Sequence, residues 1–426
     1  MTGQDIYEMT ALERQGAAAK AASRVLSVAS EEQKNKALHA IADALIAHAD
    51  EWLDANRADL EAAKAAGMRE SLIDRLALDT KRVEQIASAV REVSSLPDPV
   101  GRVIDETVRP NGLVIQKRRV PLGVIAMIYE ARPNVTVDAA VLCLKSGNAC
   151  ILRGGKEAIN SNICAERIMR EALETAGLPA DCISLVKDTS RQSSAELMHL
   201  NEYVDVLIPR GGAGLIRAVA KESSVPVIRT GEGVCHVYVD AAADLDMAAE
   251  VLFNAKCSRP SVCNACECVL VHESVLKPFL EKALPLLDTR AVELRADEPA
   301  FEAIKGLGHA VLAADDADWD TEYGDQILAV KTVSGVAEAI DFITLHGTQH
   351  SESIITEDAG AAKKFLDEVD AAAVYHNAST RFTDGGEFGL GAEIGISTQK
   401  MHARGPMGLE ELTSWKYVVF GKGQVR

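Results

Sequence analysis

Cys263 lies in a part of the sequence whose residue types suit nucleophilic chemistry. It stands among Arg259, Ser261 and Asn264, directly before a stretch in which a turn or a helix can begin. Backbone amides at such a position favour a thiolate and also stabilise an oxyanion. Cys263 is therefore a candidate for a thiol that attacks a carbonyl carbon.

The segment around Cys263 also raises the question of a metal site. Residues 254–268 hold four of the nine cysteines in the pattern C-x5-C-x2-C-x-C. No second CxxC and no neighbouring HxxxH completes a structural zinc site, and Cys268 begins the apolar run CVLVH. We therefore expect no metal, with Cys257, Cys266 and Cys268 as small buried side chains. His346 and His350 flank a turn-like Gly-Thr pair, so we expect hydrogen-bonded histidines there rather than metal ligands.

Gly211, Gly212 and Gly214 follow the apolar run 204–208 and open a helical stretch. Backbone amides at this point can approach an anion at the positive end of the helix. The sequence PRGGAG is not the GxGxxG fingerprint, so a tight β–α turn is an equally good interpretation.

Arg153 and Lys156 flank two glycines at the end of the apolar run 149–152. Two cations separated by small residues can hold phosphate groups. Alternatively they are a solvated pair, although cations at a helix start oppose the helix dipole unless an anion binds.

Alternating strands and helices must position these residues. Helical spacing dominates residues 30–95, and short apolar runs from Gly123 onward alternate with helical stretches. These runs are 124–128, 149–152, 183–186, 204–208, 225–228 and 236–239. The alternation predicts a doubly wound α/β domain, in which ligands bind beyond the carboxyl ends of parallel strands.

Residues 103–108 and 113–120 predict a β-hairpin around a Pro-Asn-Gly turn, and residues 415–420 predict a further strand. Because an isolated hairpin is marginal in water, we expect it to join another sheet or another subunit. These segments therefore predict a homo-oligomer, a dimer or a tetramer.

Composition excludes several classes of protein. The chain has 426 residues, 47% of them hydrophobic, and a formal net charge of −18. The acidic balance argues against nonspecific nucleic-acid binding, and no apolar run reaches the length of a membrane span. The N-terminal residues do not resemble a signal peptide, and the scattered cysteines fit a reducing compartment, so we expect a cytoplasmic protein.

Several motifs together resemble the γ-glutamyl phosphate reductase family of the aldehyde dehydrogenase superfamily. The similar stretches are residues 121–125, 129–136, 145–148, 153–158, the Cys263 segment, 346–351 and 397–409. They cover most of the chain in the expected order. Phe342 departs from the family signature, which usually has histidine there.

The resemblance implies an NADPH-dependent reduction of L-glutamyl 5-phosphate to L-glutamate 5-semialdehyde in proline biosynthesis. It implies Cys263 as the nucleophile that forms a thioester, and Asn134 as a side-chain donor to the oxyanion. Arg229 takes the position of the glutamate that activates water in hydrolytic aldehyde dehydrogenases, which favours phosphate-linked chemistry.

For the cofactor, NADPH/NADP+, the resemblance implies Arg153 with Lys156 near the adenosine ribose and its 2′-phosphate. Gly211 and Gly212 match the turn near the pyrophosphate, and Glu322 matches a carboxylate that orients the nicotinamide ribose.

The implied architecture is aldehyde dehydrogenase-like, with a doubly wound cofactor domain, a smaller α/β catalytic domain and a β oligomerisation element. The expected divisions are 1–102 with 121–240 for NADPH, 241–399 for catalysis, and 103–120 with 410–426 for oligomerisation. We expect the acyl phosphate to come from a separate glutamate 5-kinase in transient contact. The alternatives are a hydrolytic aldehyde dehydrogenase, a silent nucleotide-binding scaffold and a zinc protein.

Overall fold

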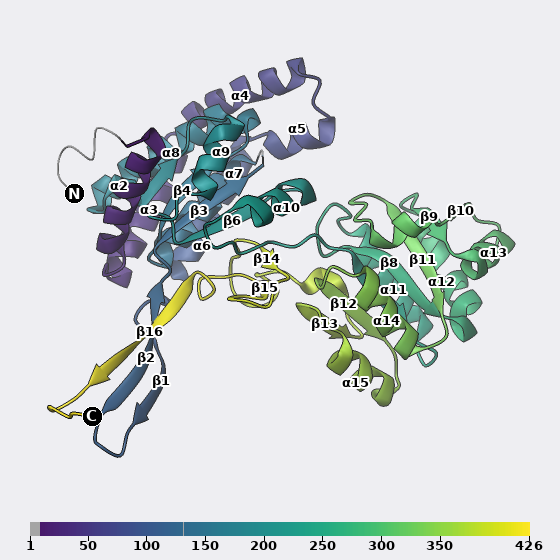
Figure 1. The fold of residues 1–426 in the computed structure, drawn as a ribbon. Coiled ribbons are helices and arrows are strands. Elements are labelled where there is room, and N and C mark those ends of the chain that lie inside the picture. The colour runs from purple at the N-terminus through teal and green to yellow at the C-terminus, as the bar shows by residue number, and fades with distance from the viewer. Residues whose placement is uncertain (1–8, 131) are drawn as a thin grey trace. The chain divides into compact units, whose positions relative to one another are not determined.

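The computed structural model describes residues 9–130 and 132–426, and the chain divides into two compact units. The first unit comprises residues 9–230, Leu390–Gly395 and Met407–Arg426. The second comprises Gly231–Gly389 and Ile396–Pro406. Each unit has its own parallel sheet, and the colours of Figure 1 follow the chain through both.

Helices form the beginning of the first unit, as the sequence predicts. They are α2 (Ala11–Leu26), α3 (Glu31–Ala47), α4 (Ala49–Ala65), α5 (Glu70–Leu76) and α6 (Thr80–Ser95). Leu38, Ile41 and Leu45 are buried on α3, whose first turn is capped by the Ser30 hydroxyl accepting from the Gln33 amide. This hydrogen bond satisfies one of the amides that have no partner inside the helix.

The first unit contains a four-stranded parallel sheet in the order β5-β4-β3-β6. The strands are β3 (Val124–Tyr129), β4 (Ala149–Arg153), β5 (Ile183–Leu185) and β6 (Val206–Arg210). The helices between and after them are α7 (Pro133–Lys145), α8 (Ile159–Ala176), α9 (Arg191–Met198) and α10 (Ala213–Glu222). This arrangement confirms the predicted strand–helix alternation. The expected strand at 225–228 contributes a single bridge, between Val227 and Leu207.

The second unit contains a seven-stranded parallel sheet in the order β10-β9-β11-β8-β7-β12-β13. The strands are β7 (Cys235–Val239), β8 (Cys266–His272), β9 (Glu293–Ala296), β10 (Leu312–Ala313), β11 (Ile327–Val333), β12 (Ser351–Ile355) and β13 (Ala373–His376). The helices are α11 (Leu245–Cys257), α12 (Leu276–Asp288), α13 (Glu298–Gly306), α14 (Val336–His346) and α15 (Ala359–Glu368).

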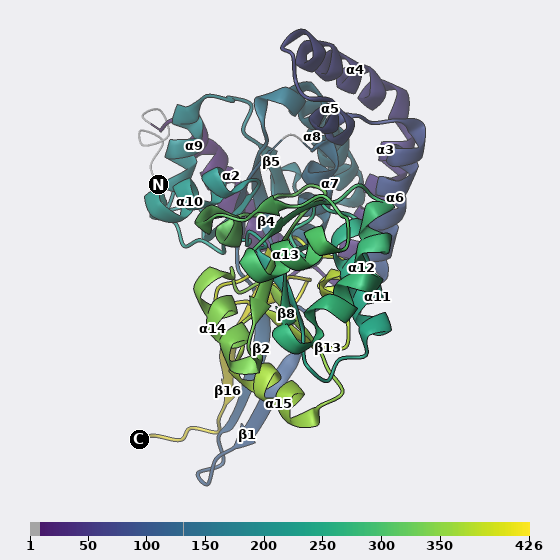
Figure 2. The ribbon, with the colours of Figure 1, turned by 90° about the vertical axis from the view of Figure 1, so that its right-hand side faces the viewer.

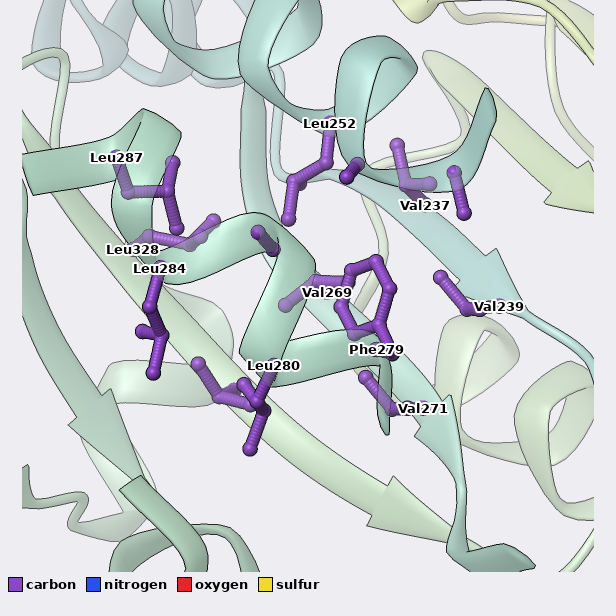
Figure 3. Close-up of a cluster of buried hydrophobic side chains, with 14 of the residues drawn as sticks. Val237, Val239, Leu252, Val269, Val271, Phe279, Leu280, Leu284, Leu287 and Leu328 are labelled. Atoms are coloured by element: carbon purple, nitrogen blue, oxygen red, sulfur yellow. The ribbon is translucent and has the colours of Figure 1, made fainter. Parts of the chain in front are cut away.

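Two apolar layers hold the seven-stranded sheet. On one face, α11, α12 and α13 pack against the sheet around Phe279, and on the other α14 and α15 pack around Tyr238 and Phe365. Figure 2 shows α11 and α12 on one side of β8 and α14 on the other. Figure 3 shows the Phe279 ring between Val269, Val271 and Leu280. Alternate strand residues therefore serve opposite faces, as buried parallel strands require.

The expected hairpin and last strand pair with one another in the first unit. Strands β1 (Val103–Val108), β2 (Val114–Pro121) and β16 (Thr413–Phe420) form an antiparallel sheet in the order β1-β2-β16. Figure 1 shows the three strands running side by side. The hairpin prediction is confirmed, and β16 covers the β2 edge.

Short elements complete the described chain. They are the two-stranded sheet of β14 (Ile396–Ser397) and β15 (Gly405–Pro406), and the 3-10 helices η1 (Lys156–Ala158), η2 (Ala180–Cys182), η3 (Glu273–Val275), η4 (Asp316–Asp320) and η5 (Thr380–Phe382). Among the described residues, none of the helices combines the length and the apolar character of a membrane span.

The division between the units lies at Thr230, ten residues before the position expected from the sequence. The apolar run 236–239 was expected in the cofactor domain, but β7 pairs with β8 and β12 of the second unit. Leu390–Gly395 belongs to the first unit instead of the second. Strand spacing along the chain cannot distinguish these alternatives, because neighbouring strands of either sheet have the same apolar pattern.

Candidate active site

Cys263 differs from the other cysteines in its exposure. It lies in the loop between α11 and β8 and is half-buried, whereas the other eight cysteines are buried. Burial raises the pKa of the Cys266 and Cys268 thiols, which keeps them protonated. Cys263 is therefore the one cysteine that is not buried, and its role as the reactive thiol stays a prediction.

The Cys263 loop packs against the start of β7. A Cβ atom at Gly233 would lie 1.4 Å from the Cys263 carbonyl oxygen, so only glycine allows this approach. The Cys235 thiol donates to the same carbonyl oxygen at 3.2 Å. Ala265 closes a turn by donating its amide to the Val262 carbonyl at 3.0 Å. Backbone contact thus holds the candidate nucleophile.

Asn264, the neighbour of Cys263, is tied to η5. Its side-chain amide donates to the carbonyls of Thr383 at 2.9 Å and Arg381 at 3.3 Å. The Thr380 hydroxyl donates to the Asn264 carbonyl at 2.7 Å. Because Asn264 is buried, these hydrogen bonds fix the loop in one position.

His350 lies close to this network but is not placed as a base for Cys263. Its Nδ1 lies 2.8 Å from the Ser351 hydroxyl and 3.7 Å from the Cys235 sulfur. Burial lowers the pKa of His350 to about 4, so the ring is neutral at neutral pH. His346 bonds to Asp320 at 2.8 Å, and both histidines are thus hydrogen-bonded as predicted.

Glu322 lies beside the Gly233 segment in the second unit. Burial raises its pKa, and a hydrogen bond from the Gly233 amide opposes that effect. Nearby, Lys256 and Glu267 form a buried ion pair with Nζ and Oε2 2.6 Å apart. Burial raises the pKa of Glu267 to about 7, although Lys256 opposes the shift. Sequence analysis missed this pair. The only feature of the sequence that could have indicated it is that each charged residue lies inside an apolar segment.

Asn134 lies in the first turn of α7. Its side-chain amide donates to Asp138 Oδ2, one helical turn later, at 2.9 Å. Burial raises the pKa of Asp138 to about 6, and the positive charge of Arg210 partly opposes this. Asp138 therefore orients the Asn134 carboxamide, a contact that the spacing of four residues could have indicated.

Arg153 and Lys156 lie at the carboxyl end of β4, as predicted. The Arg153 guanidinium donates to the carbonyls of Thr189 at 2.7 Å and Ser190 at 3.0 Å. Its Nε is buried and forms no hydrogen bond within the described residues. Lys156 is exposed. The two cations are therefore close in sequence but differently placed: backbone carbonyls hold Arg153, whereas Lys156 is exposed.

Gly211 and Gly212 precede α10 and surround the Glu130 side chain. The Gly212 amide donates to Glu130 Oε1 at 3.0 Å, and a Cβ at Gly211 would lie 2.6 Å from Glu130 Cδ. The Gly212 amide, which the sequence analysis considered as a donor to an anion, thus donates to the Glu130 carboxylate in the structure. Sequence analysis did not identify Glu130, which follows β3 and accepts from the amide of the residue before α10.

Comparison with known proteins gives the family. The aldehyde dehydrogenase family profile matches residues 6–303. The γ-glutamyl phosphate reductase of Lachnospira eligens is 55% identical over 418 residues, covering 98% of this chain and 100% of the relative. The corresponding protein of Halothermothrix orenii is 57% identical over 408 residues, covering 96% and 97%. The chain belongs to the aldehyde dehydrogenase family.

A solved member of the family has the same fold. The crystal structure of γ-glutamyl phosphate reductase from Thermotoga maritima has a TM-score of 0.95 and 49% identity, covering 98% of this chain and 100% of that chain. This similarity confirms the aldehyde dehydrogenase-like α/β fold, and the matches to relatives confirm the resemblance drawn from the motifs.

Phe342, which departs from the family signature, packs against two aromatic rings. Its ring centroid lies 5.9 Å from that of His236 and 5.7 Å from that of Trp319, both edge to face. His236 Nε2 is buried and forms no hydrogen bond within residues 9–130 and 132–426. An apolar ring therefore packs beside an unpartnered nitrogen at this position.

Among the residues described, no group of three or more His, Cys, Asp or Glu side chains could hold a metal ion.

Proposed function

We propose that this chain is an NADP-dependent acyl-phosphate reductase that converts L-glutamyl 5-phosphate to L-glutamate 5-semialdehyde and phosphate in proline biosynthesis. The observation that carries this proposal is the one half-buried thiol, Cys263, held in a loop braced by Gly233 and Asn264. Relatives named γ-glutamyl phosphate reductase over nearly the whole chain support the choice of substrate.

Cys263 acts as the nucleophile. Its thiolate attacks the acyl carbon, and the carbonyl electrons move onto oxygen to form a tetrahedral oxyanion. When the oxyanion collapses, the carbon–oxygen bond to the phosphoryl group breaks and phosphate leaves with the bonding electron pair. The glutamyl group is then a thioester on Cys263.

Asn134 is the proposed side-chain donor to the oxyanion, together with the Cys263 backbone amide. Asp138 supports this role because it accepts one amide hydrogen of Asn134 and so fixes the plane of the carboxamide. A single donor of this kind lowers the barrier by roughly 3–4 kcal/mol.

A nicotinamide cofactor fits the residues of this family member. The buried Arg153 Nε without a hydrogen bond and the exposed Lys156 provide donors for the 2′-phosphate of NADPH at the carboxyl end of β4. We assign Gly211 and Gly212 to the pyrophosphate side, where Glu130 must yield the Gly212 amide. Glu322 is the proposed partner of the nicotinamide ribose. When bound, NADPH supplies the hydride that reduces a thioester.

Release of the product returns Cys263 to its starting state. The carbon bound to the Cys263 sulfur carries an oxyanion after reduction, and its collapse breaks the carbon–sulfur bond. The sulfur leaves as a thiolate, and the aldehyde departs. The same donors that stabilise the first oxyanion therefore serve twice.

We propose a cytoplasmic homo-oligomer that receives its substrate from a separate glutamate 5-kinase by transient contact. The three-stranded sheet supports an oligomer, because Trp415, Tyr417, Val419 and Phe420 expose large apolar side chains on β16.

The test is the reverse reaction, NADP+ reduction with pyrroline-5-carboxylate and phosphate. Cys263→Ala should lower the rate by about 10⁴-fold or more, because an essential nucleophile is removed. Cys164→Ala, a change at a buried cysteine in α8, is the matched control and should retain the rate. Retained activity in Cys263→Ala, or an acyl adduct found by mass spectrometry on another thiol, would contradict the proposal.

A further inference from the structure

We propose that Arg381 and Arg259 form a binding site for the phosphoryl group that leaves as Cys263 is acylated. This inference rests on the proposed function and adds the residues that recognise the anionic leaving group.

The Arg381 side chain lies across the loop that carries Cys263. Its Nε donates to the Ser258 hydroxyl at 3.1 Å, and its Nη1 donates to Asn264 Oδ1. Ser258 and Asn264 stand at the two ends of the loop, one next to Arg259 and the other next to Cys263. The guanidinium is therefore fixed beside the candidate nucleophile.

The backbone that carries Arg381 is equally well held. Arg381 lies in η5, whose start is capped by the Ser379 hydroxyl. The carbonyls of Arg381 and Thr383 both accept from the Asn264 side chain, and the Thr380 hydroxyl donates to the Asn264 carbonyl. A donor held this firmly loses little conformational entropy when a ligand binds.

The two arginines near this loop are not engaged in ion pairs among the described residues. Within the part of the chain that the structure describes, neither Arg259 nor Arg381 forms an ion pair, although the chain carries a net charge of −18. Burial lowers the pKa of Arg381, the neighbouring positive charge of Arg259 lowers it further, and the negative charge of Asp384 partly opposes both effects. Two guanidinium groups that repel each other become favourable neighbours when a dianion binds between them.

Holding the Cys263 loop in place uses only some of the donors of the two arginines. It accounts for Nε and Nη1 of Arg381, but Nη2 makes no hydrogen bond within the described residues. It does not account for Arg259, which is exposed and likewise forms no side-chain hydrogen bond there. These remaining donors are the ones available to phosphoryl oxygens.

The structure of an acyl phosphate requires its phosphoryl group to lie close to the attacking thiolate. In an acyl phosphate a single oxygen joins phosphorus to the carbon that the thiolate attacks, whereas the α-carboxylate lies at the other end of the glutamyl chain. As the carbon–oxygen bond breaks, its electron pair stays on the phosphate, whose negative charge increases. Fixed guanidinium groups beside Cys263 stabilise that charge.

The decisive variant is Arg259→Gln, because this exposed side chain forms no hydrogen bond and no ion pair among the described residues. In the reverse reaction, KM for phosphate should rise about tenfold to a hundredfold. KM for pyrroline-5-carboxylate should stay within about twofold, because that substrate carries the carboxylate but no phosphate. Arg381→Lys should change the same constant, and Arg290→Gln, an exposed arginine of the same unit, is the control.

Direct binding of inorganic phosphate, measured by calorimetry on wild type and Arg259→Gln, separates this proposal from the assigned reaction. Loss of phosphate binding in the variant supports the site even if the wild type does not turn over. An unchanged phosphate KM and unchanged phosphate binding in Arg259→Gln would overturn it. A raised KM for pyrroline-5-carboxylate alone would assign the pair to the α-carboxylate and also overturn it.

Discussion

The Asp138 carboxylate orients the side chain of Asn134 through a hydrogen bond. They lie one turn apart on α7, and the buried carboxylate accepts from the carboxamide at 2.9 Å. Because Asp138 accepts one amide hydrogen of Asn134, the second amide hydrogen remains for the proposed role as an oxyanion donor. Burial of Asp138 is the cost of this arrangement, because its charged form is poorly solvated.

Asp138 predicts how stability depends on pH. Its pKa is raised from 3.8 to about 6 in the folded protein, so the folded state holds a proton that the unfolded state releases between these values. Stability should therefore fall by about 3 kcal/mol as pH rises from about 4 to 6. Asp138→Asn removes the charge but keeps an acceptor for Asn134, and should flatten this part of the profile. Urea unfolding across this pH range measures it, and equal slopes in both proteins would contradict it.

Arg229 predicts that aldehyde oxidation depends on phosphate. By resemblance it takes the place of the glutamate that activates water, and it is exposed at the end of the first unit. Without that carboxylate the proposed thioester needs phosphate as its acceptor. NADP+ reduction with pyrroline-5-carboxylate should fall to background when phosphate is omitted, and arsenate should restore it. Sustained turnover without either anion would contradict the prediction and favour a hydrolytic enzyme.

At the scale of elements, the approach of β7 to the Cys263 loop depends on one glycine. A side chain at Gly233 would overlap the Cys263 carbonyl, so Gly233→Ala must displace the loop. We expect kcat to fall about a hundredfold, because a small misplacement of the proposed nucleophile is costly. The matched control is Gly306→Ala at the end of α13, where an added Cβ meets nothing within 4 Å. Wild-type kcat in Gly233→Ala would show that the loop tolerates displacement.

Helices and strands were predictable from the sequence where residues that are neighbours in the chain determine them. Contacts between residues far apart in the chain were not predictable. The hairpin follows from residues that are neighbours in sequence, and it is confirmed. The membership of β7 depends on which strands it pairs with, and Glu130 reaches a glycine turn 82 residues later. Cys263 could be proposed from the sequence because the residues around it are polar. The ion pair of Lys256 and Glu267 could not, since each charge is compensated only in the folded structure.

At the scale of the whole molecule, the three-stranded sheet predicts self-association. Trp415, Tyr417 and Val419 alternate along β16 and so share a face, on which Tyr417 is 60% and Val419 52% exposed. Lys117 covers the Trp415 ring at 3.9 Å but leaves the rest of this face in solvent. Replacing both Tyr417 and Val419 by Lys should therefore convert an oligomer to monomers at micromolar concentration. Association would then bury two lysine charges that have no acidic partner, which is unfavourable.

Light scattering after size-exclusion chromatography measures the molar mass of both proteins. Leu345→Lys is the matched control, because Leu345 is 76% exposed on α14 and lies outside the sheet. It should keep the wild-type mass, since a lone exposed apolar side chain rarely marks an interface. Monomeric wild type, or an unchanged mass in the double variant, would show that this sheet is not the association surface. Because β1 and β16 are its edges, added strands from a second copy would also cover backbone groups that are otherwise unpaired.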